Sequence, residues 1–522
     1  MTVPRVLPLI LAGLLSVALV APTAVAGGDL SKGDRRVLSD YAVDTWRSFV
    51  AMTNPATGLT ADNIQADTRV NSKYTSPTNI GSYIWSTLAA RDLGIIKPKE
   101  ARDRIAVTLR TLASMERHED SGMYYNWYDP DTGAKLVIWP VDGGTVYPFL
   151  SSVDNGWLAA ALIMVGNTVP QLRREALAIF DDMDFGFYYD PGAGLLRGGF
   201  WKDPPAGQCS FAGNYEGRGP NVYYTCHHYG SLNTEPRIAS YIGIAHNDIP
   251  ATHYFRMSRT FPETCDWGWP EMNPEGVTRT YYGVDVYEGH YTYRGMDIVP
   301  SWGGSMFEAL MVPLLVPEEE WGARSWGVNH PLYVRAQIEH GLDEADYGYW
   351  GFSPSNDPAG GYREYGVDPI GLNPDGYASD QERTLVDYGF ETPEGDGYCP
   401  GREPKPEPES YGQGVVTPHA SFLALDYEPR AALRNLANLR RDFDAYGWGG
   451  FYDAINVGDP ETSLNRGQTS RHYLALDQGM IMAALANELR NDRLQRYFTQ
   501  GEIRDSIRPI LRVEEFTAGE AG

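Results

Sequence analysis

The stretch "DLGIIKPKEA", residues 92–101, contains the end of one helical pattern and the start of the next. Gly94 is typical of the residue after a helix, because glycine adopts the left-handed conformation there at little steric cost. Pro98 is typical of the first helical position, where its missing N–H leaves no hydrogen bond unmade. The stretch therefore predicts two helices, over 77–93 and 98–117, whose short connection makes them antiparallel neighbours.

A short break followed by a proline that starts a helix recurs in "AHNDIPATHYF" around Pro250 and in "LDYEPRAAL" around Pro429. Hardly any segment alternates as a strand does, whereas twelve segments have apolar residues at helical spacing: 34–53, 77–93, 98–117, 152–166, 169–183, 232–247, 249–260, 303–315, 328–341, 415–426, 428–441 and 470–489. We therefore predict an all-α fold in which six outer helices surround six inner ones as a toroid. A helical repeat solenoid is the alternative, but the sequence has no fixed period or repeated motif.

Long segments rich in Gly, Tyr, Trp, Asp and Pro separate the helical pairs, at 184–231, 261–302 and 343–414. Long ordered loops in compact domains are often functional, so we expect them to gather at one end of the toroid and line a cleft. The acidic, proline-rich stretch 391–410 is the most linker-like. Helical segments continue beyond it in the same style, which predicts one domain over 27–522 that ends in a peripheral helix after residue 491.

The chain begins with the pattern of a secretory signal peptide. Arg5 precedes an apolar run over 6–20, and Ala24 to Ala26 matches a small-residue cleavage site, so we expect residues 1–26 to be removed. No other stretch is long and apolar enough to span a bilayer. These features predict a secreted or periplasmic protein without membrane insertion. In such a protein the four cysteines suggest two disulfides, with the pairing left open: Cys209, Cys226, Cys265 and Cys399.

Composition narrows the class of partner. The formal net charge is −25, which repels nucleic acid and anionic membranes. Aromatic residues make up 12% of the chain, with 34 Tyr and 13 Trp. Aromatic rings stack on sugar faces and carboxylates bind hydroxyl groups, so a polysaccharide or oligosaccharide partner fits. Any acidic exported protein would fit the same composition, and the sequence does not indicate an oligomeric state.

An acidic residue heads the apolar helical stretch "GSLNTEPRIASYIGIA", residues 230–245. Either Thr234 or Asn233 is expected to cap this helix, and Pro236 is tolerated in its first turn. Glu235 precedes Ile238 and Ile242 at helical spacing, so it heads the buried face.

Three other acids lie on apolar faces in the same way: Asp154, Glu308 and Asp477. Such an acid is more often a paired structural residue, but four of them predict a shared wet site, because buried carboxylates are costly unless paired or protonated. Glycoside hydrolysis requires two carboxyl groups, one protonated and one ionised. A helix N-terminus lowers the pKa of Glu235, so burial or a neighbouring anion must outweigh it if this residue is the acid.

Other acidic patterns do not predict a metal site. Asp129 and Asp131 in "YDPDTG" form a turn pattern. The stretch "VDPIGLNPDGYASD" is suggestive of oxygen ligands for calcium, but it lacks the spacing of an EF-hand. The HExxH, GxSxG and P-loop motifs are missing from the sequence. We therefore expect neither a metal nor a cofactor.

Seven motifs occur in a characteristic order: "TSPTNIGSYIWSTLAARDLGII", "YNWYDPDTG", "SSVDNGWLAAALI", "LNTEPRIASYIGIA", "WGGSMFEALM", "VVTPHASFLAL" and "ALDQGMIMAALAN". The ordered set resembles the glycoamylase-like family over roughly residues 35 to 490. That family includes the bacterial endo-β-1,2-glucanases of glycoside hydrolase family 144, and it is related to the central domain of cyclic β-1,2-glucan synthases. The resemblance implies an (α/α)6 toroid and hydrolysis of a β-linked glucan by carboxylate acid/base catalysis.

The resemblance also implies roles for single residues. Glu235 matches the position of the general acid, and Asp154 lies where the glucanases have a glutamate, one methylene longer. The expected substrate-binding residues are Glu308, Asp477, Trp302, Trp448, Tyr125 and Trp127. The alternatives are a transglycosylase, a hydrolase of another envelope polysaccharide, and a glycan-binding protein without catalysis.

Overall fold

The helical hairpin predicted from residues 92–101 is present in the computed structural model, which describes residues 30–214, 220–260, 274–372, 414–458, 463 and 465–520. Helix α2 (Pro77–Asp92) ends before Gly94, whose φ of 79° is left-handed. Helix α3 (Pro98–Ser114) begins with Pro98 in its first turn. The two helices pack against each other, as the short connection requires.

Eleven of the twelve predicted helical segments contain an α-helix. The α-helices of the described residues are α1 (Lys32–Met52), α2, α3, α4 (Ser152–Thr168), α5 (Arg173–Phe180), α6 (Arg237–Ala245), α7 (Met306–Leu310), α8 (Glu318–Trp321), α9 (Trp326–Glu339), α10 (Pro418–Leu423), α11 (Pro429–Asp442), α12 (Ala475–Arg490), α13 (Arg493–Phe498) and α14 (Glu502–Val513). Shorter turns of 3-10 or π helix are η1 (Pro170–Leu172), η2 (Phe185–Tyr188), η3 (Ala251–Arg256), η4 (Val312–Leu314), η5 (His340–Glu344), η6 (Asp368–Ile370) and η9 (Ala424–Asp426).

The prediction for 249–260 is wrong, because this segment forms only the 3-10 helix η3. The ring of His253 bonds to the carbonyl oxygen of Gly194 and to Ser240, and the backbone is extended again by Met257. Tertiary contacts of the His253 imidazole, rather than the packing of a helix face, therefore hold this segment in place. Beyond residue 491 the chain forms two helices, α13 and α14, where one was expected.

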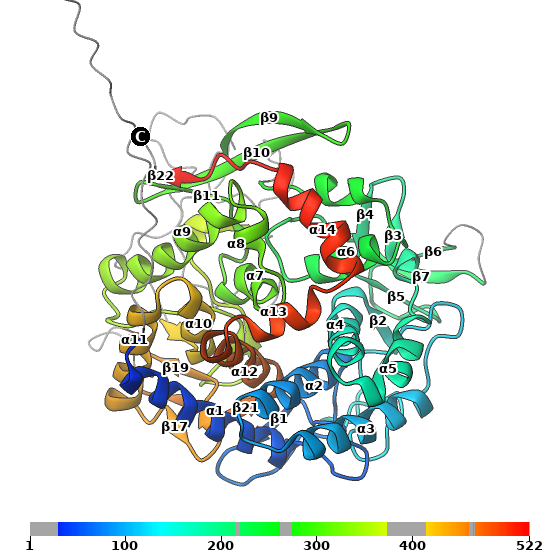
Figure 1. Cartoon of the computed structure of the whole chain (residues 1–522), viewed down its shortest axis with the longest axis horizontal. Coiled ribbons are helices and arrows are strands. Elements are labelled where there is room, and N and C mark those ends of the chain that lie inside the picture. Colours follow the sequence, from blue (N-terminus) through cyan, green and yellow to red (C-terminus); the bar gives the residue numbers. More distant parts are fainter. Residues whose placement is uncertain are drawn as a thin grey trace, which may run out of the picture.

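The helices are arranged in a ring (Figure 1), in which α6 and α7 are joined by the hydrogen bond from Arg237 to the carbonyl oxygen of Glu308. Helix α2 packs against α12 and α4, α4 packs against α6, and α10 packs against α12 and α7. Each of these also contacts a partner nearer the outside: α1 contacts α12 and α2, α3 contacts α2, α5 contacts α4, η3 contacts α6, α9 contacts α7, and α11 contacts α10. Helices α2, α4 and α12 are buried around most of their circumference, as expected for helices covered on all sides.

Two glycines allow the inner helices to approach closely. A Cβ atom on Gly81 of α2 would lie 2.9 Å from the carbonyl oxygen of Trp157 in α4. A Cβ atom on Gly156 of α4 would lie 3.1 Å from the backbone of Ala239 in α6. Both contacts involve backbone, which cannot move aside as a flexible side chain can. The spacing of α2, α4 and α6 therefore depends on these positions.

The expectation of a fold almost without strands is wrong. The described residues contain eight small sheets, in the orders β1 (Asn63–Gln65)–β21 (His472–Leu474); β22 (Gly519–Glu520)–β11 (Met296–Ile298)–β10 (Val284–Tyr293)–β9 (Glu275–Tyr281); β12 (Ser301–Trp302)–β15 (Gly371–Leu372); β13 (Ser355–Asn356)–β14 (Tyr362–Arg363); β16 (Val415–Val416)–β19 (Ala454–Asn456)–β20 (Thr469–Ser470); β17 (Tyr446–Gly447)–β18 (Gly450–Phe451); β2 (Phe149–Ser151)–β5 (Gly199–Trp201)–β7 (Val222–Thr225)–β6 (Ser210–Gly213); and β3 (Tyr189–Asp190)–β4 (Leu195–Arg197)–β8 (His228–Tyr229).

The longest hairpin joins β9 to β10 through Tyr282 and Gly283. Both residues have positive φ, 51° and 79°, which fits the two-residue turn that matches the twist of a hairpin. This turn usually reads Asn-Gly or Asp-Gly, so Tyr-Gly gave a weak signal. Most other strands span two to four residues, too few for an alternating pattern to be recognised.

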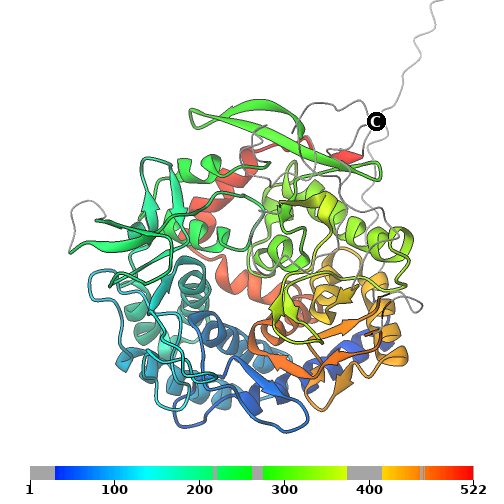
Figure 2. The same cartoon turned by 180° about the vertical axis from the view of Figure 1, so that it is seen from behind.

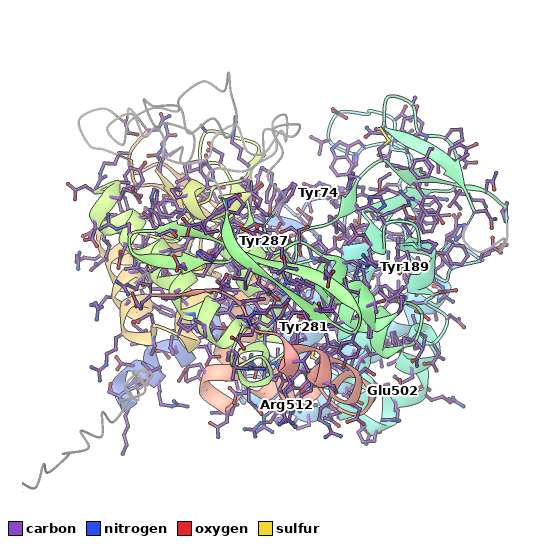
Figure 3. The ribbon with its side chains drawn as sticks, turned by 90° about the horizontal axis from the view of Figure 1, so that it is seen from above. Tyr74, Tyr189, Tyr281, Tyr287, Glu502 and Arg512 are labelled. Atoms are coloured by element: carbon purple, nitrogen blue, oxygen red, sulfur yellow. A yellow bond between two sulfur atoms is a disulfide. The ribbon has the colours of Figure 1, made fainter. Side chains whose placement is uncertain are left out.

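The two ends of the ring differ. Helices α13 and α14 lie on the face toward the viewer in Figure 1, whereas the short strands β17 to β21 lie toward the viewer in Figure 2. In the side view, Tyr74 lies near the end that bears the loops, and Glu502 and Arg512 of α14 lie at the opposite end (Figure 3). The expectation that the predicted loops gather at one end is met only in part. The β9–β10 hairpin, which belongs to the predicted loop 261–302, runs along the side of the ring, and Tyr281 near its turn donates a hydrogen bond to the carbonyl oxygen of Glu515, just after α14.

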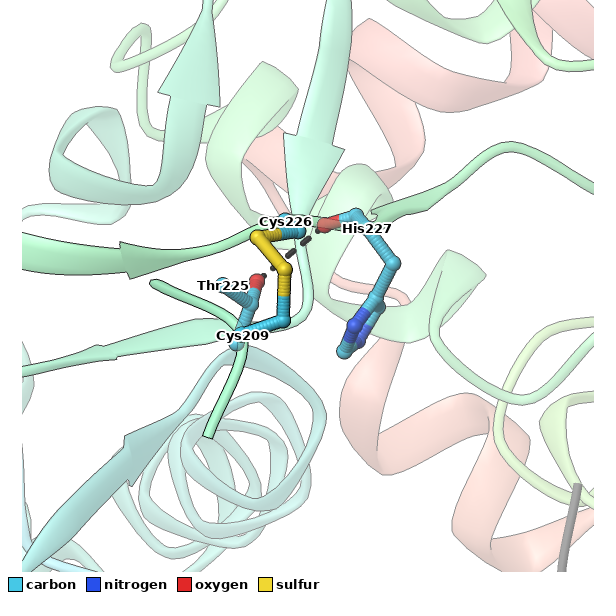
Figure 4. The surroundings of a disulfide bond; sticks show 4 residues. All are labelled: Cys209, Thr225, Cys226 and His227. Carbon is cyan, nitrogen blue, oxygen red and sulfur yellow. Dashed lines mark hydrogen bonds between the residues drawn. A yellow bond between two sulfur atoms is a disulfide. The ribbon is translucent and has the colours of Figure 1, made fainter. Parts of the chain in front are cut away.

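A disulfide joins Cys209 to Cys226 (Figure 4). Cys209 precedes β6 and Cys226 follows β7, so the bond closes the base of this hairpin. The pairing was left open by the sequence. Cys265 and Cys399 lie outside the described residues, as do the predicted signal peptide at 1–26 and the linker-like stretch 391–410. Within the described part of the chain, no helix combines the length and apolarity needed to cross a bilayer.

Replacing Gly156 with valine is expected to lower the free energy of unfolding by about 2 kcal/mol, because the new side chain forces α4 and α6 apart. Urea unfolding followed by circular dichroism measures the change. The matched control is Gly33→Val, since Gly33 is exposed in the first turn of α1 and a Cβ atom there would meet only Ser31 at 3.4 Å. Equal midpoints for Gly156→Val and the wild type would contradict the close-packing argument.

Candidate active site

Glu235 lies two residues before α6 rather than inside it. Helix α6 begins at Arg237, and its N-cap residue Pro236 makes no side-chain capping bond. The expected caps, Thr234 and Asn233, are therefore wrong. Proline at this position separates Glu235 from the first helical turn.

Two helices hold Glu235 in place of a cap. Its backbone N–H donates to Oε2 of Glu308 in α7 at 2.9 Å. Its own Oε2 accepts a hydrogen bond from Nε1 of Trp157 in α4 at 2.7 Å. Glu235 and Glu308 are thus direct neighbours, and Trp157 fixes the orientation of the Glu235 carboxyl group.

The surroundings raise the pKa of Glu235 well above its ordinary value. Burial is the largest cause, and the nearby carboxylates of Glu308 and Asp154 add to it. The hydrogen bond from Trp157 and the positive charge of Arg237 act in the opposite direction. Burial and the neighbouring anions therefore outweigh the effect of the helix start, and the carboxyl group is suited to hold a proton.

Asp154 lies in the first turn of α4, one helix away from Glu235. The Ser151 hydroxyl caps this helix by accepting from the N–H of Asp154 at 3.2 Å. Oδ1 of Asp154 accepts a hydrogen bond from Thr78 at 2.6 Å. Burial raises the pKa of Asp154, and the hydrogen bond from Thr78 opposes the shift. The structure thus brings Asp154 to the same group of acids as Glu235.

Glu308 belongs to the first turn of α7, where the Ser305 hydroxyl is the cap. Trp302 precedes this helix in β12 and is partly exposed. Between them, Gly303 and Gly304 have φ of 59° and 66°, so the chain turns sharply from the strand into the helix. Trp302 lies six residues before Glu308 in the chain, and its role in substrate binding stays a prediction.

Asp62 is a further acid of the site that the sequence did not reveal. It precedes β1 and accepts hydrogen bonds from Nδ2 of Asn79 at 2.8 Å and of Asn63 at 3.0 Å. Burial raises the pKa of Asp62, and the charge of Asp154 adds to the shift. Asp62 lies in a loop without helical periodicity. The other acids were identified because they share a helix face with apolar residues, and this criterion does not apply to a loop.

Asp477 lies in the first turn of α12 and belongs to a second buried group with His419 and Asp453. One ligand atom of each of the three lies within 4.8 Å of the others, which makes this the one group of possible metal ligands among the described residues. Asp453 and Asp477 are hydrogen-bonded to each other. A proton shared between the two carboxyl groups is therefore the alternative to a metal ion at this place. The sequence did not reveal Asp453, which also follows a loop.

The two aspartates of this group are shifted in the same direction. Burial raises the pKa of Asp477 to about 6, with the charge of Asp62 adding to it. Burial and the charge of Asp477 raise the pKa of Asp453 well above its ordinary value. Burial lowers the pKa of His419 to about 4, so its ring is neutral at pH 7. Asp62 therefore links this group to Asp154 and Glu235 through its charge.

The predicted aromatic residues separate into two kinds. Trp127 packs edge-on against Tyr74 at 5.4 Å, and the Tyr74 hydroxyl accepts from Asn63, which also bonds to Asp62. Trp127 therefore lies near the acids.

The other two predicted aromatic residues are engaged by neighbouring side chains. Tyr125 is buried and its ring is covered by the ammonium group of Lys135 at 4.2 Å. Trp448 lies against Tyr473 at 5.1 Å, and the Arg69 guanidinium covers its ring at 4.3 Å. The contacts seen for these two residues involve none of the acids, and their role in substrate binding stays a prediction.

Comparison with known proteins supports the resemblance to the glycoamylase-like family. Residues 273–502 match the sequence model of the glycoamylase family, described as "Putative glucoamylase", and residues 40–192 match a family described as "Protein of unknown function (DUF3131)". The cyclic β-(1,2)-glucan synthase NdvB of Rhizobium meliloti is 24% identical over 92% of this chain. The aligned region is 19% of NdvB, so the chain spans about a fifth of that protein.

Solved structures share the fold. An endo-β-1,2-glucanase from Chitinophaga pinensis, in complex with sophorotriose and glucose, has a TM-score of 0.60 at 17% identity over 92% of this chain and 98% of that one. An endo-β-1,2-glucanase from Talaromyces funiculosus, in complex with sophorose, has a TM-score of 0.58 at 12% identity over 94% and 92%. The fold is therefore of the glucoamylase and glucanase type, and the resemblance drawn from the ordered motifs is confirmed.

The variant Glu308→Gln is expected to lower the pKa of Glu235, because it removes the neighbouring negative charge while keeping an oxygen for the Glu235 N–H. The indole N–H of Trp157 touches the titrating carboxyl group, so its NMR signal followed against pH reports the change. Glu339→Gln on α9 is the control, because Glu339 pairs with Arg294 and Arg335 at the surface. A titration curve that Glu308→Gln leaves in place would disprove the electrostatic coupling.

Proposed function

We propose that this protein is a glycoside hydrolase that cleaves β-1,2-linked glucan, with Glu235 as the general acid. The observation that supports it most directly is the raised pKa of Glu235 beside the carboxylates of Glu308 and Asp154. A carboxyl group that keeps its proton can donate it to the glycosidic oxygen, while an ionised neighbour acts on the other side of the bond. The β-1,2 linkage is inferred from the NdvB match and from the glucanases that share the fold.

Asp154 is the proposed partner of Glu235, as the base or nucleophile. It lies in the first turn of α4, three residues from Trp157, which bonds to Glu235. Asp477 is the second candidate for this role. Its pKa of about 6 suits a base near neutral pH, and its Oδ2 lies 3.2 Å from Nδ1 of His419. Glu308, Trp302 and Trp127 are then positioned to bind sugar units.

We also propose the architecture of the domain and the cellular location of the protein. The order of inner contacts, with an outer partner for each inner helix, supports an (α/α)6 toroid formed by a single domain over 27–522. The pattern of residues 1–26 supports export to the periplasm or the exterior.

Glu235→Gln is expected to lower kcat on β-1,2-glucan by about 10²- to 10⁴-fold, because the amide cannot donate a proton to the leaving oxygen. Release of reducing ends from the polysaccharide measures the rate. Glu100→Gln on the exposed surface of α3 is the control and should keep full activity. A panel of β-glucans with other linkages, all left uncut together with β-1,2-glucan, would refute the proposed function.

Comparing Asp154→Asn with Asp477→Asn decides the second carboxylate, since the variant of the true base loses activity as fully as Glu235→Gln. Product analysis then separates hydrolysis from transglycosylation, which the NdvB match favours as a second candidate function. A hydrolase yields shorter linear oligosaccharides, whereas a transglycosylase yields longer or cyclic products without new reducing ends.

A further inference from the structure

Directly behind the acids lies a buried arginine whose donors are all used. Nε of Arg237 donates to Oε1 of Glu318 at 2.8 Å, and Nη2 donates to Oε2 of Glu318 at 2.9 Å. The remaining N–H groups donate to three backbone carbonyl oxygens, of Thr234 at 2.7 Å, Glu308 at 3.1 Å and Ala309 at 2.7 Å. All five N–H groups of the guanidinium therefore have a partner.

The backbone contacts of Arg237 join the two segments that supply the acids. Thr234 immediately precedes Glu235, and the Glu308 carbonyl belongs to the residue whose carboxylate accepts from the Glu235 N–H. One rigid, planar group thus binds both segments from behind. Because the guanidinium fork has fixed geometry, it sets the position of one segment relative to the other.

The charge of Arg237 is matched by Glu318 at the start of α8. Each oxygen of Glu318 accepts two hydrogen bonds: Oε1 from Arg237 and Tyr241, and Oε2 from Arg237 and His330. Burial alone would raise the pKa of Glu318, but Arg237 and His330 lower it to about 2. The side chains of Arg237 and Glu318 are both fully buried, so the pair is a neutral unit inside the protein.

A buried ion pair of this kind adds little stability over well-packed apolar residues, because desolvation cancels much of the attraction. Its presence beneath the acids therefore calls for another role. Without Glu318, the positive charge of Arg237 would stabilise the ionised form of Glu235 and lower its pKa. Without Arg237, the negative charge of Glu318 would raise that pKa further.

We propose that Arg237 is a positioning residue that holds Glu235 and Glu308 in register, and that Glu318 neutralises Arg237 so that the pair exerts little net charge on Glu235. This inference rests on the proposed function of Glu235. It adds a separation of tasks, in which the geometry comes from the guanidinium and the electrostatic balance comes from its partner.

The charged groups that face Glu235 come from three elements. Glu308 faces it from α7, Asp154 from α4, and Arg237 from α6, while Trp157 donates the direct hydrogen bond. Arg237 lowers the pKa of Glu235, and the other two charged groups raise it. Glu318 lies behind Arg237, so its removal changes the field at Glu235 without removing any group that contacts it.

Two variants test the two tasks separately. Glu318→Gln keeps an oxygen for hydrogen bonding but leaves Arg237 unbalanced, so Glu235 should lose its proton at lower pH. The alkaline limb of the kcat profile, and the Trp157 indole titration, should both move down by about one pH unit. Arg237→Lys keeps the charge but loses the planar fork, so kcat should fall about tenfold or more while the alkaline limb stays in place.

The control is a second buried group of charges, in which Arg259 pairs with both Glu514 and Glu288, and Glu514 also bonds to Tyr254. Glu514→Gln should lower the thermal midpoint, as Glu318→Gln does, yet leave kcat and the alkaline limb unchanged. Apparent melting temperatures show whether any loss of rate reflects unfolding. A pH shift in the control as large as that in Glu318→Gln would overturn the inference.

Failure of the inference differs from failure of the proposed function. The Trp157 titration needs no substrate, so an unchanged curve in Glu318→Gln overturns the inference whether or not the protein cuts β-1,2-glucan. A wild-type rate in Arg237→Lys overturns it as well. If the wild type cuts no glucan, the proposed function fails, and the titration alone decides whether Glu318 balances Arg237.

Discussion

The removal of carboxyl groups from water is the constraint on which the centre of this structure depends. Glu235, Asp154, Asp62 and Asp477 all have raised pKa values, and burial is the largest cause in each case. Burial makes the ionised form of each acid costly, and the negative charges of neighbouring acids add to this cost. The cost of burial therefore favours the protonated form, which the proposed acid catalysis requires.

The ring of helices explains how so many acids reach one place. Asp154, Glu308 and Asp477 each lie in the first turn of an inner helix, and Glu235 lies just before another. Inner helices with the same direction bring their first turns to the same end of the ring. The glycine contacts that set the spacing of α2, α4 and α6 therefore also set the spacing of the carboxylates.

The sequence predicted the helices better than the strands, for a physical reason. Pro98 and Pro429 open helices by fixing φ, and Gly94 ends one, so these signals are local and strong. The β9–β10 hairpin turns at Tyr282 and Gly283, where the positive φ of tyrosine is determined by the tertiary structure. Strands of two or three residues depend on partners far away in the chain, which no local pattern reveals.

The site shows the same division between local signals and long-range contacts, and Glu235 is the example, because burial and neighbouring carboxylates raise its pKa. Its apolar face was visible in the spacing of Ile238 and Ile242, but the helix start was not, because Pro236 ends up as the N-cap instead of entering the first turn. Glu235 is thereby excluded from capping, and its N–H is free to bond to Glu308. Asp62 and Asp453 lie in loops, so only the folded chain brings them to the other acids. Burial and the neighbouring carboxylates raise the pKa of Glu235, and this shift reconciles its place beside the helix start with the proposed role of an acid.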